Sequence, residues 1–287
     1  MVSNLMSRLY GMDVINWEEL VSYDDRNFLV SVHKEHKNPH LDSVDPNGYL
    51  LKVFNLRDSQ IPQYIDALYA MTDFIRQKKV PTPERIPNLD GKFFSLQKIY
   101  TDLDNPSCTE YREYIVVLQT FIPGSTLDKV PLTPPLFYKC GKFTGFIDKA
   151  LKDFYHSYYE NHQSIWSMEF IPKLKDFTFA IEDQKKHQVV NEVIDAYKWQ
   201  ILPLFPEFQK GQIHGDMNLL NILAQEKPSL TVSTTSTTDN NSSYCVTEDK
   251  DRDYILCGII DFADATHSCP KRVEYNGELC VGICLRQ

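Results

Sequence analysis

The sequence predicts an α+β protein with two lobes, a strand-rich N-terminal lobe over residues 1–121 and a helical C-terminal lobe over residues 122–287. Before the boundary, short apolar runs alternate with turn signals such as Asn47-Gly48, which is typical of strands. After it, apolar residues recur at helical spacing. Pro123-Gly124 interrupts the pattern between the two parts. A chain of 287 residues is long enough to bury the core of one large two-lobed domain.

One helix is expected among the strands of the N-terminal lobe. It starts near Ser59, where apolar residues begin to recur at helical spacing, and it ends at the cations Lys78 and Lys79, before Pro81. Residues 10–20 are of mixed character and are expected to lead into the first strand. The expected strands are a hairpin over 21–30, a strand over 49–54, and two paired strands over 93–99 and 114–121.

The C-terminal lobe is expected to contain two long helices, over residues 136–155 and 189–202. Residues 227–253 are polar and include a run of Ser, Thr and Asn, a composition that cannot bury enough apolar surface to fold. We expect them to form a disordered loop at the tip of a hairpin. One strand of that hairpin starts at Ile222, and the other covers residues 254–260.

The bulk composition is that of an ordinary globular protein, with 42% hydrophobic and 24% charged residues. No apolar run approaches the ~20 residues that a membrane span requires, and residues 1–8 lack the apolar core of a signal peptide. The net charge of −9 argues against a general nucleic-acid binder. The seven cysteines are scattered, so a reduced protein of the cytoplasm is expected.

A turn and a later strand end carry the pattern of a phosphotransfer site. His214-Gly215-Asp216 follows an apolar residue, Asn221 comes five positions after Asp216, and Asp261 ends a later apolar run. A carboxylate on a rigid turn can accept the proton of an attacking hydroxyl, so Asp216 is the expected catalytic base. Asn221 and Asp261 offer the hard oxygens that Mg²⁺ requires and are the expected metal ligands.

Each of these residues also has a purely structural interpretation. Asp216 alone could cap local backbone groups, Asn221 could be a turn residue, and Asp261 could end a strand. The combined spacing favours the functional interpretation. His214 is expected to hold the turn in shape through bonds to nearby backbone rather than to react. For Asp264, a metal ligand, a hydrogen-bond partner of the ligands and the N-cap of a following helix remain alternatives.

Lys52 is the candidate for binding the phosphates of a nucleotide. A lysine inside an apolar strand needs a partner, because burying its charge alone is costly, and Asp66 on the following helix is the expected partner. The alternative is that Lys52 faces solvent on the open side of a sheet. The polar turn from Ser22 to Asn27 is expected to lie over the phosphates through hydroxyls and backbone amides, although it contains no glycine.

Together, these motifs resemble the aminoglycoside phosphotransferase branch of the protein-kinase-like fold. The resemblance depends first on His214-Gly215-Asp216 with Asn221, and on Ile259-Ile260-Asp261-Phe262. It extends in the expected order through about residues 15–268. The further matching stretches are residues 22–28, 51–53, 58–60, 87–92 and 165–168.

This resemblance implies a small-molecule kinase that takes part in lysine degradation. The implied reaction transfers the γ-phosphate of GTP, or of ATP, to the side-chain hydroxyl of 5-hydroxy-L-lysine. Asp216 would be the base, with Asn221 and Asp261 on Mg²⁺. Lys52 would bind the phosphates, and the hinge from Gln119 to Phe121 would hold the purine. A small amino alcohol is the expected partner, and neither nucleic acid nor membrane is expected.

Two departures from the family pattern leave alternatives open. Asp66 stands where the family usually has Glu, and the chain ends soon after Asp264, where the family continues with helices that complete the large lobe. The C-terminal lobe is therefore expected to be truncated. One alternative is an inactive nucleotide-binding form that acts as a regulatory partner or folds poorly. Another is a kinase for a different amino alcohol or an aminoglycoside. The sequence leaves the oligomeric state and the choice between GTP and ATP undetermined.

Overall fold

A computed structural model describes the backbone of residues 1–100, 109–162, 164, 166–227, 253–268, 272–275 and 278–281. The chain divides into two compact units. Unit 1 consists of residues 1–123 together with 156–161, and unit 2 of residues 124–155 together with 162–287. The sequence places the boundary at residue 121, whereas this division falls after Pro123 and assigns one later segment to the first unit.

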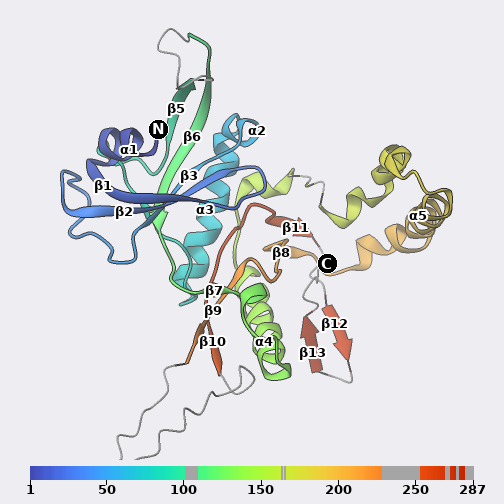
Figure 1. The fold of residues 1–287 in the computed structure, drawn as a ribbon. Coiled ribbons are helices and arrows are strands. Elements are labelled where there is room, and N and C mark those ends of the chain that lie inside the picture. The colour runs from blue at the N-terminus through green and yellow to red at the C-terminus, as the bar shows by residue number, and fades with distance from the viewer. Residues whose placement is uncertain are drawn as a thin grey trace, which may run out of the picture. The chain divides into compact units, whose positions relative to one another are not determined.

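Unit 1 is built on a six-stranded antiparallel sheet (Figure 1). The strand order is β1-β2-β3-β6-β4, and β5 pairs with β6. Every strand pairs with an antiparallel neighbour, as short connections between sequential strands allow. The strands are β1 (Met12–Leu20), β2 (Arg26–His36), β3 (Tyr49–Val53), β4 (Arg85–Ile86), β5 (Ser95–Tyr100) and β6 (Tyr111–Thr120).

One face of this sheet packs on the N-terminal helical turns α1 (Val2–Leu5) and η1 (Met6–Tyr10). Because side chains alternate along a strand, Leu51 and Val53 enter this core while Lys52 between them points to the opposite face. The buried residues of this core include Met6, Tyr10, Phe28, Tyr49, Val116 and Leu118.

The helix expected from Ser59 to Lys79 is observed as α3 (Pro62–Gln77), and a separate short helix, α2 (Leu56–Ser59), precedes it. Pro62 has no N–H and its ring disfavours a helical residue before it, so one helix ends and another begins there. Asn55 caps α2 by accepting from the Asp58 N–H. On the sheet face that carries Lys52, the Tyr69 hydroxyl of α3 donates to Gln119 Oε1 at 2.8 Å.

The predicted strands of unit 1 are largely confirmed. The hairpin across residues 21–30 is β1 and β2, in which Leu20 pairs with Asn27, and the pair over 93–99 and 114–121 is β5 and β6. The expectation for residues 10–20 was incomplete, because most of that segment is strand β1 itself. Its side chains are mainly exposed, so the segment lacks the apolar signal that a buried strand would show.

Unit 2 begins with a three-stranded sheet of order β10-β9-β7 that packs against helix α4. The predicted hairpin is confirmed, since β9 (Ile222–Glu226) pairs antiparallel with β10 (Tyr254–Ile259). Helix α4 (Pro134–Leu151) begins two residues before the predicted start and ends four before the predicted end. The remaining elements here are β7 (Ser125–Thr126), η2 (Leu127–Lys129), β8 (Gly211–Ile213) and β11 (Thr266–Ser268).

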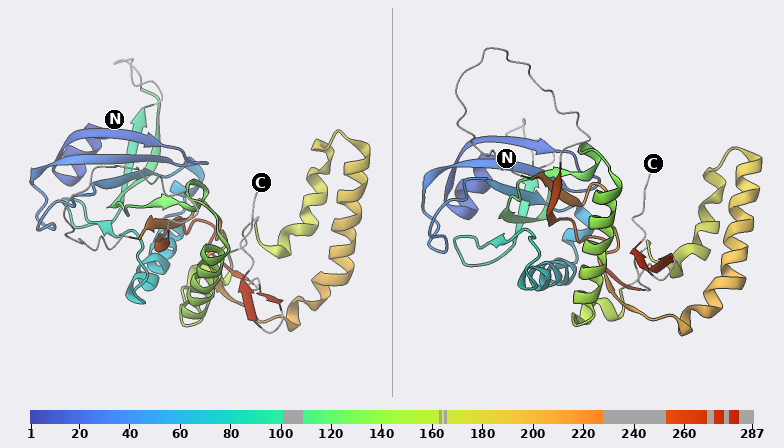
Figure 2. Two further views of the ribbon diagram at one scale, coloured as in Figure 1. Left: turned by 60° about the horizontal axis from the view of Figure 1, so that its bottom comes forward. Right: turned by 90° about the horizontal axis from the view of Figure 1, so that it is seen from below.

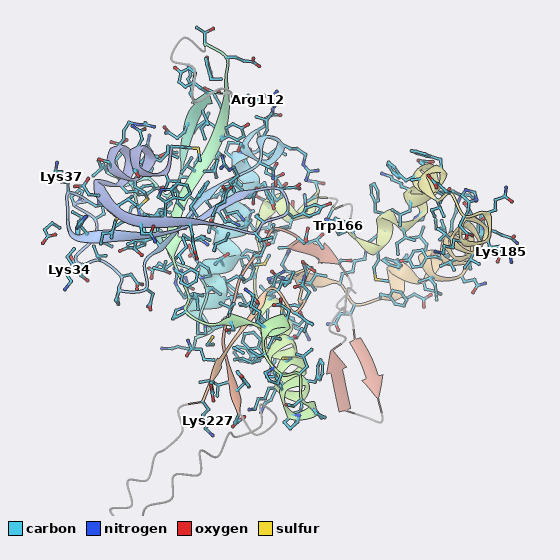
Figure 3. All side chains as sticks on the ribbon, in the orientation of Figure 1. Lys34, Lys37, Arg112, Trp166, Lys185 and Lys227 are labelled. Atoms are coloured by element: carbon cyan, nitrogen blue, oxygen red, sulfur yellow. The ribbon has the colours of Figure 1, made fainter. Side chains whose placement is uncertain are left out.

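Ion pairs hold together the end of the β9–β10 hairpin that lies next to residues 227 and 253. Asp253 forms ion pairs with Lys139 on α4 and with Lys227, which follows β9 and is labelled in Figure 3. These cations hold the pKa of the Asp253 carboxyl below its usual range, chiefly through the hydrogen bond from Lys139. Most of the predicted loop over 227–253 lies outside the described residues.

The second part of unit 2 is helical. The predicted helix over 189–202 is observed as α5 (Gln184–Ala196), continued by η5 (Tyr197–Ile201). The 3-10 segment η4 (Met168–Ala180) runs beside α5 (Figure 2), and Lys175 joins them through an ion pair with Asp195 at 2.6 Å. The other elements are η6 (Leu202–Glu207), β12 (Arg272–Tyr275) and β13 (Glu278–Val281) in unit 2, and η3 (Ser157–Glu160) in unit 1.

Among the described helices, none combines the length and apolar character needed to cross a membrane.

Candidate active site

The turn between β8 and β9 carries the predicted base. Met217 and Leu219 in this turn pack against the core that α4 forms with β9. The Leu219 carbonyl also accepts from the Asp128 N–H of η2 at 3.3 Å. Two apolar anchors at alternate positions leave Asp216 and Asn218 only partly buried. Apolar contacts with the core therefore hold the turn in place, while the side chains of Asp216 and Asn218 remain partly accessible to solvent.

His214 connects this turn to the end of β10. Its side chain is buried; Nδ1 accepts from the Asp216 N–H at 3.3 Å, and Nε2 lies 3.1 Å from the Ile260 carbonyl oxygen. One nitrogen must accept and the other donate, which the neutral ring does. Burial lowers the pKa of His214, and the nearby carboxylates of Asp261 and Asp216 oppose this only in part. The predicted role of His214 in bonding to backbone is confirmed.

Gly215 lets two backbone segments approach each other closely. Its φ is +87°, and a Cβ at this position would lie 2.0 Å from the Asp264 carbonyl oxygen. Any side chain would therefore clash with backbone, which cannot rotate away. Of the alternatives for Asp264, the N-cap is wrong, because the chain after it forms strand β11 rather than a helix.

The Asp216 carboxylate is held by two amide groups. Asn218 Nδ2 donates to Asp216 Oδ2 at 2.8 Å, and Asn221 Nδ2 donates to the same oxygen at 3.1 Å. Asn221 Nδ2 also bonds the Asp216 carbonyl oxygen at 2.9 Å. Because the amide nitrogen of Asn221 faces Asp216, its Oδ1 is turned the other way and is available as an oxygen ligand.

Asp261 lies beside Asn221. The Ile260 N–H donates to the Asn221 carbonyl oxygen at 2.9 Å, which continues the β9–β10 pairing by one step, and Asp261 follows directly. Asp261 is exposed and has a φ of +61°, a left-handed conformation that Asp adopts more readily than most residues. The structure thus brings Asp216, Asn221 and Asp261 together at one end of the hairpin in unit 2.

The donor set of this hairpin end suits a hard cation. It offers a carboxylate and an amide oxygen, and Mg²⁺ is usually held by one or two such protein ligands with water and phosphate oxygens completing the shell. Among the residues the structure describes, no group of three or more His, Cys, Asp and Glu side chains is placed to hold a metal.

The predicted partner of Lys52 was wrong. Lys52 Nζ lies 2.8 Å from Asp25 Oδ2, and both side chains are about nine-tenths buried. Asp66 instead lies 3.7 Å from His156 Nε2, with its side chain 65% exposed. Asp25 is fixed in turn, because its Oδ1 accepts from the N–H and the Nδ2 of Asn55 at the start of α2. The β1–β2 turn, not α3, supplies the carboxylate.

The other predicted nucleotide residues also lie in unit 1. Asn27 pairs with Lys52 across β2 and β3, and its Nδ2 donates to Ser22 Oγ at 3.2 Å. The Gln119 side chain is buried against Tyr69, so any contact with a purine would come from backbone at this position. The Phe121 N–H donates to the Gly48 carbonyl oxygen at 3.4 Å.

Known proteins that are similar to this chain are named as kinases. No family model matches the chain. Hydroxylysine kinase of Xenopus laevis is 30% identical over 267 residues, which cover 91% of this chain and 63% of the relative. Hydroxylysine kinase of Danio rerio is 28% identical over 266 residues, covering 92% and 64%. The chain is similar to hydroxylysine kinases. It spans less than two thirds of the length of these relatives.

Solved structures establish the fold. Spectinomycin phosphotransferase, in complex with ADP and spectinomycin, superposes with a TM-score of 0.52 at 12% identity, covering 93% of this chain and 69% of that one. The GDP complex of aminoglycoside 2'-phosphotransferase-IIIa gives 0.51 at 14% identity, covering 94% and 74%. The chain therefore has the bilobal α+β fold of these kinase-like phosphotransferases, as the sequence predicts.

Sequence reasoning missed two residues of the candidate site. Asp25 is one of two adjacent carboxylates in the β1–β2 turn, and nothing local distinguishes it from Asp24 as the one that reaches Lys52. Asn218 follows Asp216 by two positions, a spacing at which an amide can bond a neighbouring carboxylate and its own turn. That spacing is a usable signal for Asn218, whereas Asp25 requires the sheet register.

Replacement of Gly215 by Ala is expected to destabilise the protein. The positive φ alone is unfavourable by about 1–3 kcal/mol, and the clash with the Asp264 carbonyl adds to this. Gly141 is the matched control, because it lies inside α4 and a Cβ added there would meet open space. Gly141→Ala should raise stability by about 0.5–1 kcal/mol. Urea unfolding measures both, and a Gly215→Ala variant as stable as the wild type would contradict the close approach.

Replacing each of the two candidate carboxylates by an amide, in separate variants, tests which one forms the ion pair with Lys52. Asp25→Asn removes a buried charge partner and is expected to lower the free energy of unfolding by about 1–3 kcal/mol. Asp66→Asn changes an exposed pair and is expected to lower it by less than about 1 kcal/mol. Thermal or urea unfolding of the two variants measures both changes in the free energy of unfolding. A larger loss in Asp66→Asn would restore the pairing predicted from sequence.

The buried His214 predicts a loss of stability in acid. In the unfolded chain the imidazole pKa is about 6.5, whereas burial lowers the pKa in the folded state. As the pH falls, the unfolded state binds the proton first, so this contribution is complete above about pH 6.5 and declines below it. His214→Gln keeps a donor for the Ile260 carbonyl without titrating there. Urea midpoints between pH 7 and 5 should fall less steeply in this variant, and equal slopes would contradict the prediction.

Proposed function

We propose that this protein is a small-molecule kinase of the cytoplasm. It transfers the γ-phosphate of GTP, or of ATP, to the side-chain hydroxyl of 5-hydroxy-L-lysine, a step of lysine degradation. The observation that carries this proposal is the gathering of Asp216, Asn221 and Asp261 at one end of the β9–β10 hairpin, with Asp216 held by amide donors. The similarity to proteins named hydroxylysine kinase supports the choice of acceptor.

Asp216 acts as the general base in this reaction. As the hydroxyl oxygen of the acceptor forms a bond to the γ-phosphorus, the bond from that phosphorus to the bridging oxygen breaks, and the nucleoside diphosphate leaves. The hydroxyl proton passes to the Asp216 carboxylate and is released to water afterwards. The apolar anchors Met217 and Leu219 keep the carboxylate in place, so orientation requires little reorganisation during transfer.

Asn221 and Asp261 are the residues that would hold Mg²⁺. The amide nitrogen of Asn221 is engaged by Asp216, which leaves its oxygen as the outward-facing atom, and the Asp261 carboxylate is exposed. When bound, Mg²⁺ supplies positive charge that offsets the negative charge of the phosphate oxygens. The left-handed backbone at Asp261 sets the direction of its side chain at the strand end.

Lys52 binds the phosphates of the donor nucleotide. Its ammonium is nearly buried on β3 and is oriented by Asp25, and the Ser22–Asn27 turn lies beside it. The hinge from Gln119 to Phe121 takes the purine through backbone groups, because the Gln119 side chain is engaged by Tyr69. Asp66 has no part in orienting Lys52 in this scheme.

Phosphate transfer tests the proposal directly. Purified protein is incubated with Mg²⁺, 5-hydroxy-L-lysine and either GTP or ATP, and diphosphate release is measured. Asp216→Asn is expected to lower kcat by about 10²–10⁴-fold, because it removes the base and keeps the shape. Asp176→Asn, an exposed aspartate of the same unit, is the matched control and should keep wild-type activity.

The acceptor series separates the related functions. Choline, ethanolamine and kanamycin replace 5-hydroxy-L-lysine in the same assay. Preference for one of them would keep the chemistry and change the substrate. Nucleotide binding without turnover on any acceptor would overturn the proposal in favour of an inactive nucleotide-binding protein, and full activity in Asp216→Asn would remove that residue from its role.

A further inference from the structure

We propose that Asn218 is a positioning residue that makes Oδ1 of Asp216 the atom that receives the proton. The inference deepens the proposed phosphotransfer function and rests on it. The observation is that both amide donors of the turn, Asn218 and Asn221, bond the same carboxylate oxygen, Oδ2 of Asp216. Among the described residues, no group donates a hydrogen bond to Oδ1.

The orientation of the Asn218 side chain is fixed by a second bond. Its Oδ1 accepts from the Leu220 N–H at 2.7 Å, and backbone bonds close the turn on both sides of it. Since the oxygen must face this N–H, the amide nitrogen must face Asp216. A reversed amide would place two acceptors, Asn218 Oδ1 and Asp216 Oδ2, against each other. Asn218 is thus committed as a donor to Asp216.

The two oxygens of the carboxylate consequently differ. An oxygen that already accepts two N–H groups presents little free lone-pair density in the direction of a third donor, whereas Oδ1 keeps its acceptor capacity. Rotation of the carboxylate by half a turn would exchange them, and the two amide bonds oppose this rotation. The acceptor hydroxyl therefore meets Oδ1, and the two-point hold on Oδ2 defines the angle at which the proton is transferred.

Asn221 cannot provide this hold alone. Its Nδ2 is shared between the Asp216 carbonyl oxygen and Oδ2, and the bond to the carboxylate is the longer of the two. Asn218 makes the shorter bond to Oδ2, at 2.8 Å, and within the described residues its amide nitrogen is not shared with a second acceptor. Asn221 ties the turn together and presents its oxygen to the metal, while Asn218 sets the rotation of the carboxylate.

Two substitutions separate this role from a structural one. Asn218→Asp keeps an oxygen for the Leu220 N–H and replaces the donor to Asp216 by a group that repels it. Asn218→Ala removes both. Leu220→Ala is the control in the same turn, because that side chain is 57% exposed. We expect kcat to fall about tenfold or more in both Asn218 variants while the KM for each substrate stays within about twofold, and we expect the control to match the wild type.

Asn218→Gln extends the series, because its longer amide can still reach the carboxylate only with a shifted angle. Partial recovery of kcat relative to Asn218→Ala is expected. Unfolding midpoints of all variants are measured in parallel. Wild-type kcat in Asn218→Asp, or a loss that appears in KM with kcat unchanged, would overturn the inference, because neither fits a residue that orients the base.

A measurement without turnover distinguishes failure of this inference from failure of the proposed function. The protein is labelled with ¹³C at aspartate carboxyl carbons, and the Asp216 signal is identified by its disappearance in Asp216→Asn. We expect this signal to move in Asn218→Ala and to stay in place in Leu220→Ala. An unmoved signal in Asn218→Ala would overturn the positioning role whatever the transfer assay shows. A moved signal in a protein without transferase activity would support the contact and reject the kinase proposal.

Discussion

The candidate site depends on one buried imidazole. His214 accepts from the N–H of Asp216 and donates to the carbonyl of Ile260, so a single ring links the turn that carries the proposed base to the strand end that carries Asp261. The ring of Phe262 lies 4.6 Å from the imidazole and covers it. Because both ring nitrogens are engaged and the ring is buried, the neutral form is favoured. The spacing between Asp216 and Asp261 thus follows from the hydrogen bonds of the buried His214 ring.

Close backbone contacts also hold the turn against the end of β10. Gly215 meets the Asp264 carbonyl where no side chain would fit, and the Ile260 N–H extends the β9–β10 ladder to Asn221. Beneath, Met217 and Leu219 hold the turn on the core next to α4. Each of these contacts acts on the backbone rather than on a reactive group. Asp216 can then remain partly exposed and Asp261 exposed, as the proposed function requires.

In unit 1 the charged candidate residue, Lys52, is nearly buried and is held by an ion pair. Because of this burial its ammonium needs a carboxylate, and Asp25 from the β1–β2 turn provides it. Asp25 is itself tied to the start of α2 through Asn55. The phosphate-binding candidate is therefore coupled to the polar turn predicted to lie over the phosphates. The sequence predicts Asp66 on α3 as the partner of Lys52, whereas the structure places Asp25 of the turn there.

The sequence by itself determined most of the strands and helices and indicated the chemistry proposed for the turn. Alternation and turn residues identified β2, β3, β5 and β6, and the spacing of Asp216, Asn221 and Asp261 indicated phosphotransfer, because these signals are local. Tertiary structure decided the partner of Lys52 and the shared hold of Asn218 and Asn221 on one oxygen of Asp216. Asp25 and Lys52 are 27 positions apart and meet only through strand register, which depends on packing of the whole sheet. Local sequence does not encode that register, so only the folded sheet could choose between Asp25 and Asp66.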